Sequence, residues 1–119
     1  MNQENYLQSL KSLLGKEVLV RVDRPLGSHH PKYPDHIYPI NYGYIEDFLA
    51  PDGDFQDAYL LGIDEAVESY FGVVIAIVVR HDDVESKLVV APQGRDFTDE
   101  EIQSTIEFQE RYFQSEILR

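Results

Sequence analysis

The sequence predicts a mainly β protein with flanking helices, an α+β arrangement in which about five short strands form an antiparallel, barrel-like sheet. Two observations lead to this prediction. Apolar residues recur at helical spacing near both ends of the chain, and the short apolar segments between them follow one another without intervening helices. The length of 119 residues is that of one domain, so we expect residues 1–119 to fold as a single unit.

The first part of the chain contains an expected helix, a strand and a long loop. Residues 3–14 are expected to be helical, because leucines recur there at helical spacing. Residues 18–22 are expected to form a strand, because every second residue is a valine. Four prolines then exclude regular structure from about residue 24 to residue 40. A loop this long in a compact domain usually binds a ligand or takes part in catalysis.

The middle of the chain contains the remaining expected strands. Residues 38–45 are aromatic-rich and are expected to be half-buried, and Asp52-Gly53-Asp54 predicts a turn. We expect strands at residues 58–63, 72–80 and 87–91. The second of these should lie in the centre of the sheet, because apolar residues occupy both of its faces.

A second helix is expected near the C-terminal end of the chain. Thr98 is a good N-cap residue, and Glu101 three positions later completes a capping box. The stripe that this helix presents to the core is expected to comprise Ile102, Ile106, Gln109 and Tyr112 or Phe113.

Charge and composition narrow the classes of partner. The chain has 22 Asp and Glu against 10 Lys and Arg, a net charge of −12. A balance this acidic argues against nucleic acid or an anionic membrane as the main partner, and it favours cations or an anionic substrate that arrives with cations. No cysteine is present, which excludes thiolate metal sites and cysteine nucleophiles.

We expect a cytoplasmic protein. The first residues include an early acid and no apolar segment of the secretory kind. The longest apolar run, residues 72–79, is far too short to span ~30 Å of hydrocarbon.

Two dense acidic segments lie on predicted turns beside strands. The first acidic segment, residues 52–57, carries Asp52, Asp54 and Asp57, and the second, residues 82–87, carries Asp82, Asp83 and Glu85. If the two converge, each pair of close carboxylates repels by about 4 kcal/mol and needs a compensating cation. Oxygen clusters of this kind suit hard cations, Mg²⁺ first and Mn²⁺ second. The alternative is that these residues only form turns and solubilise the surface.

Cationic side chains complement the acidic segments. Lys87 lies two residues from Glu85, so the period-two geometry of a strand places both side chains on one face. This pair is either a phosphate contact beside metals or an ordinary surface ion pair. The other candidate cations are Lys32, Arg24 and Arg80.

Four stretches, taken in order, resemble the soluble family I inorganic pyrophosphatases. They are residues 23–32, the aromatic turn Tyr38-Pro39-Ile40-Asn41-Tyr42-Gly43-Tyr44-Ile45, the first acidic segment, and the second acidic segment. The aromatic turn followed closely by the D-x-D-x-x-D pattern is the specific part of this resemblance. The resemblance implies an OB-like barrel, several Mg²⁺ ions and hydrolysis of inorganic pyrophosphate to two phosphates by metal-activated water.

The resemblance also implies a role for each matching residue. It implies that Asp52 and Asp57 bind the metals that hold the attacking water, and that Asp54 is the general base. It further implies that Asp82, Asp83 and Glu85 bind the metals that bridge the substrate phosphates. The implied phosphate contacts are Lys32, Tyr42, Lys87 and Tyr112, of which the first three also count as catalytic.

The sequence departs from the family pattern at several points. The hairpin after Lys32 is missing, and with it a Glu and the active-site Arg of the family, so Arg24 or Arg80 is the candidate replacement cation. Glu85 stands where the family usually has Asp, and Phe113 stands where it has Lys. Two alternatives therefore remain: a hydrolase of another small diphosphate, and a non-catalytic metal- or phosphate-binding module. Self-association is also expected, because a small barrel with exposed Tyr and Phe often has an apolar patch to cover.

Overall fold

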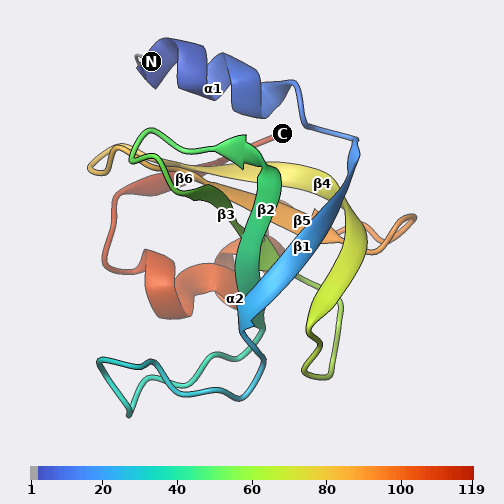
Figure 1. Ribbon diagram of the computed structural model, residues 1–119, viewed down its shortest axis with the longest axis vertical. Helices are drawn as coiled ribbons and strands as arrows, with labels where there is room; N and C mark the ends of the chain where they lie inside the picture. Colours follow the sequence, from blue (N-terminus) through green and yellow to red (C-terminus); the bar gives the residue numbers. More distant parts are fainter. Residues whose placement is uncertain (1–2) are drawn as a thin grey trace.

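A closed β-barrel with one helix at its end and another on its side forms the fold (Figure 1). The computed structural model describes residues 3–119. Its elements are, in order, α1 (Gln3–Lys11), β1 (Glu17–Arg24), β2 (Asn41–Leu49), β3 (Phe55–Leu60), β4 (Ser69–Arg80), β5 (Lys87–Ala91), α2 (Asp99–Glu110) and β6 (Ser115–Leu118).

The barrel closes because β1 pairs with both β2 and β4. Around the barrel the strand order is β1-β2-β3-β5-β4, and β6 extends the sheet beyond β4. The predicted barrel is confirmed, but one pair differs from the antiparallel expectation, because β3 and β5 run parallel. The reason is topological: the β4–β5 hairpin returns β5 into the gap between β3 and β4, so β5 has the direction of β3.

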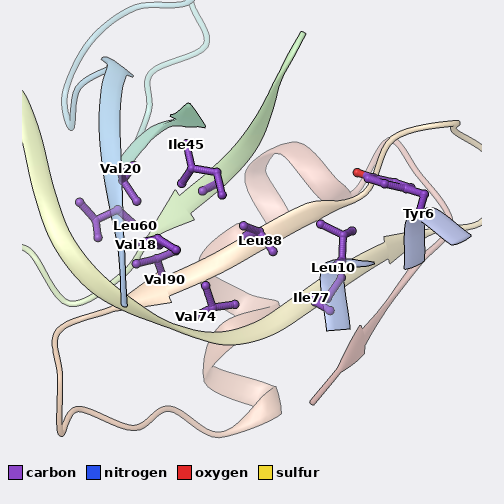
Figure 2. Packing of buried hydrophobic residues seen from close by; sticks show 11 residues of the cluster. Tyr6, Leu10, Val18, Val20, Ile45, Leu60, Val74, Ile77, Leu88 and Val90 are labelled. Carbon is purple, nitrogen blue, oxygen red and sulfur yellow. The ribbon is translucent and has the colours of Figure 1, made fainter. Parts of the chain in front are cut away.

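The barrel interior holds the first hydrophobic core (Figure 2). Val20, Leu60 and Leu88 are fully buried in it, and α1 closes one end of the barrel with Tyr6 and Leu10. Alternation along the strands explains the arrangement, since every second side chain points inward.

The second hydrophobic core lies between the barrel wall and α2. Ile102 and Ile106 of α2 pack there against strand residues such as Tyr59 and Val89. Every residue of β5 is buried, because this strand contributes to both cores. In β4 the register shifts around Ile75, so Val74 and Ile77 both belong to the inner core although they are three residues apart.

Most elements occur where the sequence predicts them. The capping box of α2 is present, with Thr98 and Glu101 as its reciprocal partners. The helix α1 ends at Lys11 rather than at residue 14, and residues 25–40 form the expected loop, with an isolated bridge between His29 and Ile37. The short strand β6 was not predicted. No helix within residues 3–119 has the length and apolarity needed to cross a membrane.

Gly43 is expected to be the least replaceable residue of the barrel wall. A Cβ atom at this position would lie 1.8 Å from the carbonyl oxygen of Arg21, so β1 and β2 approach too closely for any side chain. We expect Gly43→Ala to lower the free energy of unfolding by about 3 kcal/mol or more, as measured by urea denaturation. Gly53→Ala is the control: its Cβ meets no atom within 4 Å, and only its positive φ opposes the change, at about 1 kcal/mol. Equal losses in the two variants would contradict this reading.

Candidate functional site

A polar cleft of about 500 Å³ opens where the loop of residues 25–40 meets the barrel and the end of α2. In Figure 1 this loop extends below α2, beyond the lower end of β1. Cationic, acidic and aromatic side chains from five strands, the loop and α2 converge in the cleft. Among them are the predicted site residues Arg24, Tyr42, Asp57, Arg80, Lys87 and Tyr112.

The ammonium group of Lys87 links the two acidic segments. Its Nζ lies 2.8 Å from Oδ2 of Asp57 and 2.9 Å from Oε1 of Glu85. The parallel register pairs Ala58 with Leu88, and it therefore sets Asp57 beside Lys87. Lys87 is buried, so little water screens its attraction to the two carboxylates, and removing either partner would leave a buried charge poorly compensated.

A buried hydrogen-bond network behind the cleft also joins the acidic segments. Gln56, in the first segment, donates from Nε2 to the carbonyl oxygen of Ser86 in the second, at 2.7 Å. The hydroxyl of Tyr6 on α1 donates to Oε1 of Gln56 at 2.5 Å and accepts from the amide of Ser86 at 3.2 Å. Burial raises the pKa of Tyr6 to about 12, so its hydroxyl remains a donor at neutral pH.

The groups around Glu85 affect its protonation. Burial raises the pKa of Glu85 to about 7; the charge of Lys87 opposes this rise, whereas the charge of Asp57 and a hydrogen bond with Asp52 add to it. Lys87 therefore contacts two carboxyl groups, those of Asp57 and Glu85, and Asp52 hydrogen-bonds with Glu85. The site has more negative charge than its own lysine compensates.

Tyr42 presents its hydroxyl next to Asp57. It donates to Oδ2 of Asp57 at 2.9 Å, from the diagonal position on the neighbouring strand. Burial, together with the charge and hydrogen bond of Asp57, holds the pKa of Tyr42 well above its usual range. Tyr42 is therefore a fixed hydrogen-bond donor in the cleft.

Arg80 is held by Glu110, an acidic partner that was not predicted from the sequence. Its Nη2 lies 2.6 Å from Oε2 of Glu110, and its Nη1 lies 3.0 Å from Oδ2 of Asp83. The Tyr59 hydroxyl also donates to Glu110, at 2.5 Å. The guanidinium carbon lies 3.7 Å from the ring centroid of Phe113. Arg80 is thus a cation at the cleft wall whose charge is largely paired.

The long loop adds a cation and two imidazoles to the cleft. Arg24 hydrogen-bonds with Tyr38, and His30 and His36 line the same wall. Burial and the charges of His36, Arg24 and Lys32 lower the pKa of His30. Its Nδ1 accepts from the amides of Lys32 and Tyr33, so the remaining proton is on Nε2.

Other predicted site residues lie outside the cleft. Asp82 accepts from the amide of Gln114 at 2.9 Å and so ties the β4–β5 turn to the start of β6. Asp83 pairs with Arg80; burial raises the pKa of Asp83, but hydrogen bonds from the Glu85 amide and Arg80 lower it overall. Lys32 is exposed on the loop, and Asp54 is exposed on its turn, where its amide donates to Asp52 at 3.0 Å.

Glu110 was not singled out from the sequence, although its position in the helix could have identified it. Glu110 occupies the third position of the stripe that begins with Ile102 and Ile106, where an acid on a buried helix face is unusual. The two histidines of the cleft carried no such signal, because their roles depend on how the loop folds.

The donor atoms around Lys87 are all oxygens of the kind that magnesium prefers. Within residues 3–119, however, no three acidic or imidazole side chains stand arranged as a metal site. Lys87 Nζ lies between the oxygens of Asp57 and Glu85, at the place where a cation compensates both.

The sequence matches no protein-family model and no curated protein. Solved structures, in contrast, share its fold. The inorganic pyrophosphatase of Ehrlichia chaffeensis aligns with a TM-score of 0.65 and 19% identity over 87% of this chain and 85% of that chain. That of Coxiella burnetii aligns with a TM-score of 0.62 and 17% identity over 87% and 84%. That of Neisseria gonorrhoeae aligns with a TM-score of 0.61 and 23% identity over 82% and 74%.

At these identities the likeness establishes the fold. The OB-like barrel with flanking helices that the sequence resemblance implied is confirmed, because these structures cover most of the chain.

We expect Arg80 and Glu110 to be energetically coupled, because they form a buried ion pair. Both side chains are 5% exposed, so Arg80→Met leaves a buried carboxylate without its main partner, at a cost of about 3 kcal/mol. The double variant Arg80→Met/Glu110→Gln should lose less stability than the sum of the two single variants, by at least ~1 kcal/mol in the free energy of unfolding measured by urea denaturation. The control cycle uses Arg21→Met and Glu46→Gln, a pair with side chains 50% and 47% exposed. Its coupling should stay below about 1 kcal/mol. Additive effects at both sites would contradict the prediction.

Proposed function

We propose that this protein hydrolyses inorganic pyrophosphate to two phosphates in a Mg²⁺-dependent reaction. The observation that carries the proposal is the meeting of the two acidic segments at Lys87, with Asp57 and Glu85 both within 3 Å of its ammonium group. The shared fold with bacterial inorganic pyrophosphatases supports the same reaction class.

The acidic cluster is the proposed Mg²⁺ site. Asp52, Asp57 and Glu85 would hold the metal, since their oxygens match its preference and their charge exceeds that of Lys87. Asp82 and Asp83, which the resemblance also implied as ligands, pair elsewhere and are not needed for this cluster. When bound, Mg²⁺ supplies positive charge to the diphosphate and lowers the pKa of water.

The other side chains of the cleft position the substrate. Arg24 offers positive charge to phosphate oxygens. Lys87 and Tyr42, which both donate to Asp57 in the structure, would turn to phosphate oxygens when Asp57 binds the metal. Tyr112 lies at the cleft edge and offers a further hydroxyl. Arg80 acts from the cleft wall as a fixed positive charge, because Glu110 and Asp83 hold it.

Proton transfer requires a carboxylate near the attacking water. We assign this role to Asp54, which lies on the same exposed turn as Asp52 and whose amide fixes the Asp52 carboxylate. Lys32, on the exposed part of the loop, is assigned to the outer side of the substrate. Both assignments follow the sequence resemblance.

The activity test compares single carboxylate-to-amide changes. With Mg²⁺ and pyrophosphate, we expect the unmodified protein to release phosphate and Asp57→Asn to lower kcat by about 100-fold. Asp64→Asn, an exposed change in the loop after β3, is the control and should keep full activity. Phosphate release by the unmodified protein that does not exceed release by Asp57→Asn would favour the non-catalytic module instead.

Metal binding can be tested without catalysis. Mg²⁺ at about 100 times its dissociation constant should add about 2.7 kcal/mol to the stability of the unmodified protein, observed as a rise in Tm. Asp57→Asn should lose most of that rise, whereas Asp64→Asn should retain it. If Mg²⁺ leaves the Tm of the unmodified protein unchanged, the proposed metal site is refuted.

A further inference from the structure

A second hollow, the aromatic pocket, adjoins the cleft. It has a volume of about 840 Å³ and lies between the loop and the C-terminal end of α2. Tyr33, His36 and Tyr112 line both the aromatic pocket and the cleft, so the two hollows meet at these side chains. Ile37 and Phe108 line the aromatic pocket but not the cleft, as do the charged residues Asp35 and Arg111.

The combined space is large for a small inorganic ion. Sites that enclose a whole drug-sized ligand have volumes of roughly 300–1,000 Å³. The cleft alone falls in this range at about 500 Å³, and its cations Arg24, Arg80 and Lys87 are the groups suited to a diphosphate. The aromatic pocket therefore offers room for a second, non-phosphate part of a substrate.

The lining of the aromatic pocket suits a flat ring. Tyr33, Ile37 and Tyr112 are 61%, 51% and 68% exposed there, an unusual gathering of apolar surface on a chain of charge −12. Phe108 supplies a further ring. Aromatic faces of this kind stack on heterocyclic bases with little preference for one base over another.

His36 supplies a polar group at the junction of the two hollows. Its ring contacts Tyr38 and Phe108, at centroid distances of 5.7 and 5.6 Å. Its Nε2 is buried, and no hydrogen-bond partner for it occurs in the described part of the chain. Leaving such an atom unpaired is costly, and a small shift of the ring that exposed it to a polar ligand group at the junction would remove that cost.

We propose that the preferred substrate of this site is a nucleoside 5′-diphosphate. Its diphosphate would lie among the cations of the cleft, its sugar near His36, and its base against Tyr33 and Tyr112 in the aromatic pocket. The inference rests on the proposed hydrolysis of a phosphoric anhydride. The water oxygen forms a bond to the β-phosphorus, and the bond from that phosphorus to the bridging oxygen breaks. The nucleoside monophosphate leaves with the bridging oxygen, inorganic phosphate is the other product, and the water proton passes to the general base.

The test compares ADP with pyrophosphate as substrates in the presence of Mg²⁺. We expect kcat/KM for ADP to exceed that for pyrophosphate in the unmodified protein. Ile37→Glu places a charge among the rings, and it should lower the ratio of the two kcat/KM values by roughly 10-fold. Phe71→Glu is the matched control, since Phe71 is 63% exposed on β4 and lines neither hollow. This variant should have the same ratio of kcat/KM for ADP to kcat/KM for pyrophosphate as the unmodified protein.

A binding measurement separates this inference from the proposed function. The non-hydrolysable α,β-methylene ADP should bind more tightly than methylenediphosphonate, by calorimetry, and Ile37→Glu should abolish the difference. If neither substrate is hydrolysed, tighter binding of α,β-methylene ADP would still support nucleotide binding in the aromatic pocket. The absence of hydrolysis would then refute the proposed activity. Pyrophosphate hydrolysis with equal binding of the two analogues would overturn the inference and leave the activity intact. A dimer that Ile37→Glu dissociates in sedimentation would also overturn it, because a second copy would then occupy the pocket.

Discussion

The site depends on how one buried ammonium group compensates the acidic segments. Asp57 lies on β3 and Glu85 lies in the turn before β5, and without Lys87 between them their charges would drive the two segments apart. The hydrogen bonds of Gln56 and Tyr6 fix the same two segments from behind, through neutral groups. The two segments are thus tied together at several points while the cluster keeps surplus negative charge, which is the condition for attracting a divalent cation.

The one parallel pair of the barrel has a direct effect on this chemistry. In the register of β3 and β5, residues 57 and 87 are neighbours, so a carboxylate and an ammonium meet without help from a loop. Strands place side chains more reproducibly than loops do. Asp57 and Lys87 at the centre of the site are therefore fixed by strands, whereas Asp52, Asp54 and Glu85 lie on turns. The aromatic side chains of the pocket come from the loop, from α2 and from the segment after α2.

Local patterns in the sequence were sufficient for much of the fold and for part of the site. Valine alternation predicted β1, and the capping box predicted the start of α2. Glu85 and Lys87 meet as expected, although Glu85 lies in the turn before β5 and not on a strand. The parallel pairing of β3 was not predictable, because nothing in a strand's own sequence names its partner. Four residues with a polar first half gave no periodic signal for β6. Arg80 was a candidate for the replacement cation, but its partner Glu110 was not predictable, because the two residues lie 30 positions apart, a separation that local patterns do not bridge.

The loop of residues 25–40 closes largely upon itself. Backbone hydrogen bonds join Gly27 to Tyr38 and His30 to His36, and the Asn41 side chain anchors Leu26 at the loop's base. The barrel core does not depend on the loop's outer residues, since none of them belongs to the inner hydrophobic core. Evolution could therefore exchange this wall between lineages, by insertion or deletion, and retune which molecules enter while the strand-borne charges stay in place.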